Sequence, residues 1–411
     1  PKNNIVKYLK VRGSYGEVGN DQIGGDRFLY LPSSYGAASD SGVNKYNFGL
    51  ASNPYTSLMI VENKIGNPDL TWEKAKKMNV GVDINLFNNC LTASFDIFKE
   101  KRNNILANRS TSPMIIGANL PAYNFGEMEN RGWEMDLNFR HHIQDFHYWA
   151  RFNYSFARNE IIYMDEVQKR YDYQMTTGRR KNQFFGLIFD GYYNSWEEIN
   201  ALDRPKSSWS GNQLQPGDVK YVDVNQDGVI DDYDMVPIGY TPVPEIIYGF
   251  SFGAQYKGFD FSILFQGADN VSIKYFGRSM WPFAKGEESA KSLIKERWTQ
   301  ERYEAGEKIT FPRLSLNPNG ETDHNYRPST LWIRDASYLR LKNLEVGYTF
   351  TGGFVKRLNL NSVRLYFNGS NLFTWTDVVD LDPEAPSRSG NVEINTYPLQ
   401  KVYNIGLNIN F

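Results

Sequence analysis

Apolar and polar residues alternate along much of this chain, and the alternation is cleanest over Val402–Phe411. The apolar positions of this stretch are Tyr403, Ile405, Leu407, Ile409 and Phe411. A period of two places them on one face of a β-strand, with Asn404 and Asn408 on the other face. This pattern fits a strand with one face in lipid and one in a wet lumen, and it also fits an edge strand of a soluble β-sandwich.

Nine further stretches show the same alternation, which brings the predicted number of strands to ten. They are Leu9–Tyr15, Met78–Leu86, Leu91–Ile97, Trp133–Phe139, Tyr148–Phe156, Tyr248–Tyr256, Phe259–Phe265, Leu344–Phe350 and Val363–Gly369. The connections alternate strictly between short and long, with the short ones after strands two, four, six and eight. Transmembrane β-barrels have short periplasmic turns and long extracellular loops, whereas a soluble sandwich has no reason to gather its long loops at one end. We therefore predict an all-β fold, a transmembrane antiparallel β-barrel with long extracellular loops.

Two segments depart from this simple pattern. Leu339 and Leu341 are out of phase with the rest of their strand. A β-bulge near Lys342 and Asn343 would restore the phase. Alternatively, the upper part of this strand leaves the bilayer and meets other protein. The second segment, Glu287–Glu301, lies in a long connection and is predicted to form a short helix.

The composition narrows the choice of protein class. The chain has 411 residues and a formal net charge of −2, which argues against nucleic acid as a partner. No apolar run approaches the roughly 18 to 20 residues of a membrane-spanning helix, but a barrel strand needs only alternate apolar residues. The 9 Trp, 27 Tyr and 26 Phe suit the aromatic girdles of a barrel and also sugar-binding surfaces. Cys90 is the only cysteine, which excludes an internal disulfide and a metal site built on cysteines.

Six short motifs occur in a fixed order along the chain and point to a family. They are VRGSYGEVGN at 11–20, NPDLTWEKAKKMNVGVD at 67–83, NFGEMENRGWE at 124–134, GDVKYVDVNQDGVIDDYDMVPIG at 217–239, SYLRLKNLEVGY at 337–348 and NLF at 371–373. Each motif is modest alone, but the ordered set resembles the SusC/RagA-like TonB-dependent transporters. The strand that ends on Phe411 also resembles the closing strand of outer-membrane barrels, whose terminal aromatic residue is read by the membrane-insertion machinery.

This resemblance implies a multi-pass importer of the cell outer membrane, not an enzyme, built on a barrel of about 22 strands with a plugged lumen. The family's TonB-contacting segment, plug domain and first barrel strands have no counterpart here, and the chain shows no signal peptide. Residues 1–411 are therefore expected to be the C-terminal half of such a barrel. The alternative is a small complete barrel, in which strand one would pair with strand ten. The resemblance also implies a SusD-like lipoprotein partner, a TonB complex that acts through the missing part, and an oligosaccharide or peptide substrate.

The sharpest local motif is a candidate calcium loop over residues 223–234, of the type D-x-[DN]-x-[DN]-G. Its expected oxygen donors are the side chains of Asp223, Asn225, Asp227, Asp231 and Asp234 and the carbonyl of Val229. Asp234 stands where an EF-hand has a bidentate Glu, so the affinity for Ca²⁺ is expected to be low. The alternative is a cluster of Asx-turns that binds no ion. By strand parity the loop lies on the extracellular side, where calcium is plentiful.

Other polar and aromatic residues carry weaker signals. The four histidines, His141, His142, His147 and His324, are expected to be solvated surface residues rather than metal ligands. The long connections contain tryptophans, among them Trp196, Trp209, Trp281 and Trp298, for which packing is a more common fate than sugar stacking. Nothing positions the loop carboxylates Glu287, Glu288 and Glu384 as a glycosidase pair. The polar strand residues Asp83, Asp136 and Arg140 are expected to line the lumen.

Three functions therefore remain open from the sequence, with transport of a nutrient across an outer membrane as the leading one. The second is an all-β surface glycan-binding protein that uses its aromatic loops. The third is a glycan hydrolase on a β scaffold, with loop carboxylates as acid and base. No motif marks the residues that would select a substrate.

Overall fold

The computed structural model describes residues 5–21, 29–31, 36–37, 45–50, 55–61, 65–111, 120–209, 213–275, 280–283, 292–315, 323–379, 381–384, 391–392 and 399–411. Its main feature is one antiparallel sheet of ten strands in the order β1-β6-β7-β8-β9-β16-β17-β20-β21-β23. These strands are β1 (Val6–Asn20), β6 (Glu73–Leu86), β7 (Leu91–Ala107), β8 (Tyr123–Ile143), β9 (Phe146–Tyr163), β16 (Ile246–Tyr256), β17 (Phe259–Asp269), β20 (Tyr338–Phe350), β21 (Ser362–Thr376) and β23 (Val402–Asn410). Each of the ten predicted strands is present, in the predicted order.

The strands extend further toward the long loops than the sequence pattern predicted. Lys99 to Arg131 was predicted to be irregular, but β7 continues to Ala107 and β8 begins at Tyr123. Within this part Lys99 pairs with Arg131 and Lys101 with Glu129. The outward-facing residues become charged there, so the apolar alternation ends while the ladder of backbone hydrogen bonds continues.

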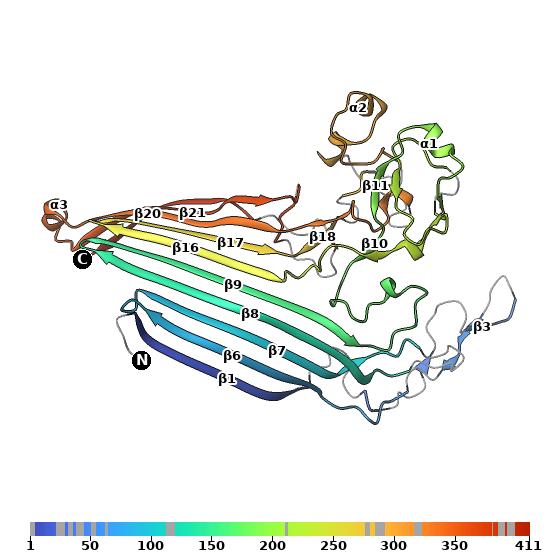
Figure 1. Cartoon of the computed structure of the whole chain (residues 1–411), viewed down its shortest axis with the longest axis horizontal. Coiled ribbons are helices and arrows are strands. Elements are labelled where there is room, and N and C mark those ends of the chain that lie inside the picture. Colours follow the sequence, from blue (N-terminus) through green and yellow to red (C-terminus); the bar gives the residue numbers. More distant parts are fainter. Residues whose placement is uncertain are drawn as a thin grey trace.

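The connections alternate as predicted, and they sort to the two ends of the sheet (Figure 1). The four short connections lie at one end, together with the small helix α3 (Gly353–Arg357). The hairpin between β16 and β17 turns on Lys257 and Gly258, whose φ angles are 44° and 92°. Positive φ at both central residues gives the tight turn whose twist matches the flanking strands. The long connections and their small elements lie at the opposite end.

Strand β20 contains the predicted β-bulge. In the register with β17, the neighbouring residues Leu264 and Phe265 face Asn343 and Leu341, so Lys342 is the extra residue. Beyond the bulge, toward the long loops, Tyr338, Arg340 and Leu341 are buried. Both alternatives that the broken phase suggested are therefore realised: the strand bulges, and its upper part packs against other protein.

The long connections carry short elements of their own. These are β2 (Gly36–Ala37), β3 (Lys45–Phe48), β4 (Tyr55–Leu58), β5 (Ile60–Val61), β10 (Phe185–Gly186), β11 (Phe189–Tyr192), α1 (Trp196–Asn200), β12 (Lys206–Ser207), β13 (Val219–Tyr221), β14 (Val229–Ile230), β15 (Val236–Pro237), β18 (Ser272–Tyr275), α2 (Gln300–Glu304), β19 (Ile333–Asp335) and β22 (Asn391–Val392), with 3₁₀ turns at Asp172–Gln174, Asp232–Asp234, Ser292–Glu296 and His324–Tyr326. None of the helices in the described part of the chain is long and apolar enough to cross a membrane.

The predicted single helix over Glu287–Glu301 is wrong for the part that is described. A 3₁₀ turn ends at Glu296, and α2 begins only at Gln300. Between them the Trp298 amide donates to the Phe311 carbonyl at 2.8 Å, and the Thr299 side chain caps α2. This hydrogen bond to a segment further along the same chain interrupts the helix. Residues 287 and 288, which include two of the loop carboxylates considered above, lie outside the described residues.

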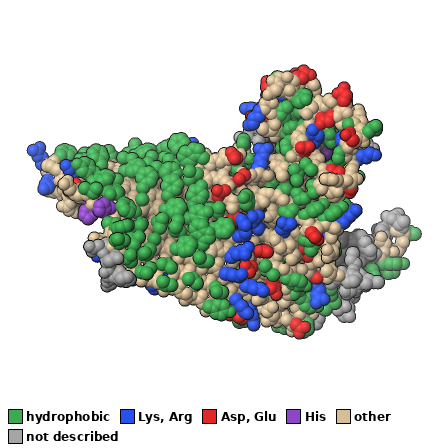
Figure 2. Space-filling model, viewed as in Figure 1, with side chains coloured by type: hydrophobic (Ala, Val, Ile, Leu, Met, Phe, Trp, Pro, Cys, Tyr) green, Lys and Arg blue, Asp and Glu red, His purple; other side chains and the backbone are tan. Residues whose placement is uncertain are grey.

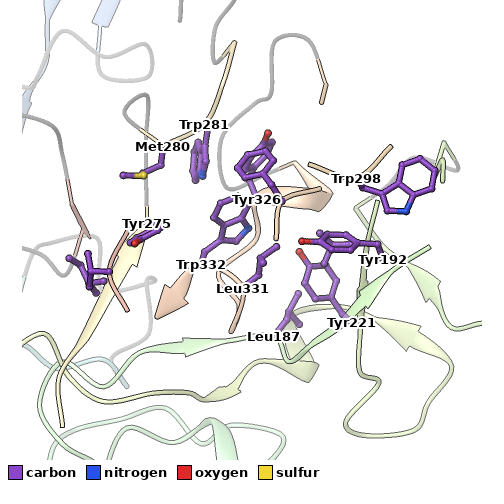
Figure 3. Close-up of a cluster of buried hydrophobic side chains, with 14 of the residues drawn as sticks. Leu187, Tyr192, Tyr221, Tyr275, Met280, Trp281, Trp298, Tyr326, Leu331 and Trp332 are labelled. Atoms are coloured by element: carbon purple, nitrogen blue, oxygen red, sulfur yellow. The ribbon is translucent and has the colours of Figure 1, made fainter. Parts of the chain in front are cut away.

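The buried hydrophobic core lies in the long connections rather than on the sheet. Its members come from three connections, β9–β16, β17–β20 and β21–β23, and include Phe311. Figure 3 shows others of them: Leu187, Tyr221, Trp281, Trp298, Tyr326 and Trp332. The buried apolar side chains on the sheet itself cluster at its loop end, for example Ala75, Ala268 and Leu372. The long loops thus fold around a core of their own, while most of the sheet stays uncovered.

The sheet is open among the residues that the structure describes. Strands β1 and β23 occupy its two edges and do not pair with each other. A complete ten-stranded barrel would require that pairing. The small-barrel alternative is therefore not what this structure forms.

Candidate functional site

One face of the sheet is apolar over most of its area. Figure 2 shows a broad continuous band of hydrophobic side chains that ends at a row of charged ones. Many of its members are freely accessible: Ile405 is 80 % exposed and Val11 is 69 % exposed. Soluble monomers rarely expose so large an apolar patch, whereas a barrel wall presents one to lipid.

Cross-strand aromatic pairs reinforce this apolar face. Phe250 on β16 stacks on Phe265 of β17, with ring centroids 4.6 Å apart. Trp133 on β8 stacks in the same way on Tyr154 of β9, at 4.7 Å. Such pairs add roughly 0.2–1 kcal/mol each to a sheet. They also supply the aromatic groups that membrane barrels place along their outer wall.

The opposite face carries charged side chains that neutralise one another across the strands. Arg12 on β1 reaches Asp83 on β6 at 3.2 Å and Asp96 on β7 at 2.5 Å. To do so it lies over Gly81, where an added Cβ would come within 2.7 Å of the arginine Cζ. The glycine therefore makes room for the guanidinium, and Asp83 lines this polar face as predicted.

A second arginine repeats this arrangement on the same polar face, near the other edge of the sheet. Arg364 on β21 lies over Gly347 of β20 and donates to Asp260 on β17 at 3.0 Å. It also reaches Glu345 at 2.6 Å. An added Cβ at Gly347 would lie 2.7 Å from the guanidinium. The sequence analysis missed both arginines; a strand glycine beside acidic residues was the available signal.

At the loop end of this polar face lies a cavity of about 430 Å³. Its walls come from β6 to β9 and from the β9–β16 connection, and they include Glu100, Arg102, Asn130 and Asn159. Glu245, which is only 4 % exposed, is held there by Arg180 and by Arg158 at 2.7 Å. A cavity with so many paired charges and amides suits a polar solute rather than an apolar one.

His324 was expected to be solvated, but it is buried in the loop core. Its ring contacts the Val219 carbonyl at 2.8 Å and the Ser207 hydroxyl at 2.9 Å. Burial lowers the pKa of His324, so the ring is neutral at pH 7 and donates to Val219. The other three histidines are exposed as predicted, with His141 and His142 near the end of β8 and His147 near the start of β9.

The loop aromatic and acidic residues have mainly structural roles. Trp281 and Trp298 are buried and Trp209 packs against the same core, as predicted, while Trp196 is exposed. Glu384 binds Arg340 at 2.5 Å and accepts a hydrogen bond from the Tyr338 hydroxyl at 2.8 Å. These contacts make Glu384 part of an ion-pair network. They do not set it opposite a second carboxylate, as a glycosidase acid–base pair would require.

The candidate calcium loop folds around its own side chains. Asp223 accepts from the Gly228 amide at 2.8 Å, and Asn225 from the Asp227 amide at 3.0 Å. Asp227 accepts from the Val229 amide at 2.9 Å. Turns of this kind, in which a short polar side chain caps the backbone that follows it, hold the segment in a tight curve.

Asp231 and Asp234, the last two expected donors of this loop, form a capping box. Asp231 accepts from the Tyr233 amide at 2.7 Å, while Asp234 accepts from the Asp231 amide at 2.9 Å and the Val224 amide at 2.8 Å. Asp234 is fully buried, and burial raises its pKa. Both of its oxygens are thus engaged by the backbone.

The fit of the loop to an ion is partial. One oxygen of Asp223 is buried without a hydrogen-bond partner, as a cation ligand would be. As the side chains lie, however, no three His, Cys, Asp or Glu residues of the described chain converge as a metal site. Asp223, Asn225, Asp227 and Val229 are the residues that would hold Ca²⁺, with Asp231 and Asp234 closing the loop behind them.

Comparison with known proteins identifies the family. The sequence model of the family described as "TonB dependent receptor-like, beta-barrel" matches residues 1–372. The chain belongs to this family of TonB-dependent receptor barrels. The family is one of outer-membrane proteins, so the apolar face of the sheet meets the lipid of the outer membrane. Its relatives are receptors rather than enzymes, in agreement with the sequence prediction.

Several relatives match this receptor chain over its whole length. TonB-dependent receptor P3 of Formosa agariphila is 27 % identical, over 100 % of this chain and 40 % of its own length. TonB-dependent receptor SusC of Bacteroides thetaiotaomicron is 26 % identical, over 99 % of this chain and 38 % of its own. The solved RagAB peptide importer, in its open-open state, shares the fold with a TM-score of 0.71 at 23 % identity, over 100 % of this chain and 41 % of that chain. The chain thus spans about two fifths of the length of these relatives.

Proposed function

We propose that this chain is the C-terminal part of a transporter that imports an oligosaccharide or peptide across the outer membrane. The observation that carries the proposal is the division of one ten-stranded sheet into an apolar side (Figure 2) and a polar side on which Arg12 and Arg364 pair with carboxylates. Such a sheet is a wall between lipid and a wet lumen. The similarity to SusC and to the RagAB peptide importer supports this class of cargo.

In the described part of the chain both edges of the sheet are bare, which supports the view that further strands complete the barrel. An open edge cannot stay in a bilayer, because its backbone amides and carbonyls would lack partners. Strands β1 and β23 are therefore positioned to pair with strands of the remaining, N-terminal part of the receptor. That part would also supply the plug and the contact with the TonB complex.

The loop core supports a role for the long connections at the mouth of the barrel. Three connections share one hydrophobic core, so they form a rigid body rather than separate flexible loops. A rigid rim offers a docking surface for a SusD-like lipoprotein that closes over the substrate. The polar cavity beside Glu245 lies at the loop end of the sheet, and the β9–β16 connection forms part of its wall.

Uptake by cells that carry the full-length receptor tests this proposal. A strain without the receptor is supplied with defined oligosaccharides and peptides, and growth is compared with the complemented strain. Transport predicts that at least one class supports growth only with the receptor, and only while the inner membrane is energised. Equal growth on every nutrient, with and without the receptor, would contradict the proposal.

We further propose that the loop over residues 223–234 binds Ca²⁺ on the extracellular side. Extracellular modules bind this ion at about 0.1–1 mM, so a weak site would still be occupied there. The orphaned oxygen of Asp223 supports the proposal. When bound, the ion would supply a positive centre that ties the oxygen donors together and stiffens the loop.

Protease protection of the segment 217–239, with calcium and with a chelator, tests the ion. Asp227→Ala is expected to remove the protection that calcium gives, because it deletes a donor. Asp232→Ala is the matched control, since this carboxylate is 74 % exposed and lies outside the proposed ligand set. Identical cleavage with calcium and with chelator in the unmodified receptor would remove the ion from the account.

A further inference from the structure

A row of basic side chains borders the apolar band on its loop side, as Figure 2 shows. On the outer face Lys99 of β7 stands directly opposite Arg131 of β8, and Lys76 of β6 stands opposite Lys101 of β7. We name these four residues the basic belt. Two positions further along the same face, Ile97 pairs with Trp133 inside the apolar band. The belt therefore begins where the lipid-facing surface ends.

The arrangement of charges within the belt is unfavourable for the sheet by itself. Like charges that stand directly opposite each other across strands destabilise a sheet. Lys99 faces Arg131, and Arg131 faces Arg158 on its other side. Arg158 is already tied to the buried Glu245. Lys99 and Arg131 thus remain as adjacent cations at the edge of the lipid.

Nearby carboxylates compensate this charge in part. Lys76 stands directly opposite Glu17 and Lys101 directly opposite Glu129, so Lys99 and Arg131 are the two belt residues that face no carboxylate directly across the strands. Lys99 approaches Glu129 at 2.9 Å and Lys101 approaches Glu127 at 2.9 Å, while Arg131 lies 3.7 Å from Glu160. These acidic residues are set further from the apolar band than the cations they pair with.

The cations are also the more exposed partners. The side chains of Lys99 and Arg131 are 54 % and 59 % exposed, whereas that of Glu129 is 15 % exposed. Exposed ion pairs contribute little, about 0–1 kcal/mol, so the cationic ends can exchange partners at low cost. The belt thus presents positive charge outward, just above the hydrocarbon.

We propose that the basic belt binds the phosphate groups of the glycolipid in the outer leaflet, lipid A. A phosphate offers the oxygen acceptors that Lys and Arg bind best, and it would relieve the repulsion between Lys99 and Arg131. The acyl chains of the same lipid would cover the apolar band directly below, around Ile97 and Trp133. The proposal needs the barrel's place in the outer membrane, with the long loops outward, but it does not depend on which solute is transported.

Native mass spectrometry of the full-length receptor in detergent tests this site. Three probes are compared: lipid A with its phosphates, lipid A with the phosphates removed, and inorganic phosphate alone. The charge-removing double variant Lys99→Gln/Arg131→Gln is expected to bind phosphorylated lipid A about 30-fold more weakly, or about fivefold for each cation removed. The matched control is Lys77→Gln, because Lys77 neighbours Lys76, is 54 % exposed and faces the lumen. It is expected to bind as the unmodified receptor does.

Each outcome decides for or against the belt. Loss of binding in the double variant, with Lys77→Gln unchanged and weaker binding of the phosphate-free lipid, supports it. Binding of the double variant within twofold of the unmodified receptor would overturn it, as would equal binding of both lipids. Displacement of the lipid by inorganic phosphate at equal concentration would assign the site to small anions instead. If the double variant does not fold, Arg131→Gln alone makes the same test, with an expected loss of affinity for phosphorylated lipid A of about fivefold. Arg131→Lys, which keeps the charge, is expected to restore that affinity.

Discussion

Arg340 holds the connection between β21 and β23 against the sheet, and its removal gives a sharp prediction. The side chain is only 2 % exposed, and it contacts Asp382 at 2.7 Å and Glu384 at 2.5 Å. Replacing it by methionine keeps most of its volume but leaves two poorly solvated carboxylates without their main counter-charge. Removing one partner of a buried pair costs about 3–5 kcal/mol.

The structure places the effect at the lower end of that range. Glu384 would keep Lys342 at 3.4 Å and the Tyr338 hydroxyl at 2.8 Å, and its side chain is 21 % exposed. Asp382 would keep the Glu384 amide at 2.9 Å. We therefore expect Arg340→Met to lower the free energy of opening of this connection by about 3 kcal/mol, which raises its open population by about two orders of magnitude.

Native-state proteolysis of the folded receptor measures this opening, because cleavage follows the population of the open form when reclosing is fast. Cleavage between residues 377 and 401 should accelerate about 100-fold in Arg340→Met. The matched control Lys342→Met removes a more exposed cation at 3.4 Å and should change the rate by less than about fivefold. Cleavage of Arg340→Met at the rate of the unmodified receptor would refute the view that this network anchors the connection.

Three further predictions follow from the two faces of the sheet and from the loop core. Gly347→Ala should lower the urea midpoint of the receptor by an amount worth about 1–3 kcal/mol, because the new Cβ displaces Arg364. Leu407→Arg should lower the level of receptor in the outer membrane through a cost of about 2–4 kcal/mol, whereas Asn404→Arg on the lumen face should be tolerated. The loop core should lose protease resistance as the pH falls below about 6.5, because buried His324, with its lowered pKa, is protonated more easily when unfolded; His324→Gln should remove this pH dependence.

The strands were predictable because lipid imposes a strict rule on them. Every second residue of a membrane-facing strand must be apolar. Stretches such as Val402–Phe411 can therefore be recognised as strands without knowing which strands lie beside them. The same rule explains where the prediction stopped short. Beyond Ile97 the outward residues are Lys99 and Lys101, and the pattern vanishes although β7 continues to Ala107.

The loop core could not be read from the sequence, because its contacts join distant segments. His324 is buried against Val219, which lies 105 residues earlier in the chain. Nothing local to His324 marks that partner. The paired arginines of the polar face are a similar case, since Arg12 meets Asp96 only when the register of three strands is known. The calcium loop stays a prediction, carried by the spacing of its donors and the orphaned oxygen of Asp223.

The central claim is that one face of the ten-stranded sheet meets lipid and the other meets a wet lumen. Spin labels placed one at a time along β17, in the full-length receptor with Cys90 replaced by serine, test it most directly. Labels at Phe261 and Ile263 should be accessible to oxygen dissolved in lipid, and labels at Ser262 and Leu264 to a water-soluble relaxation agent. This period of two is the result that the structure predicts. Accessibility without alternation along β17, or with the two faces reversed, would contradict the account.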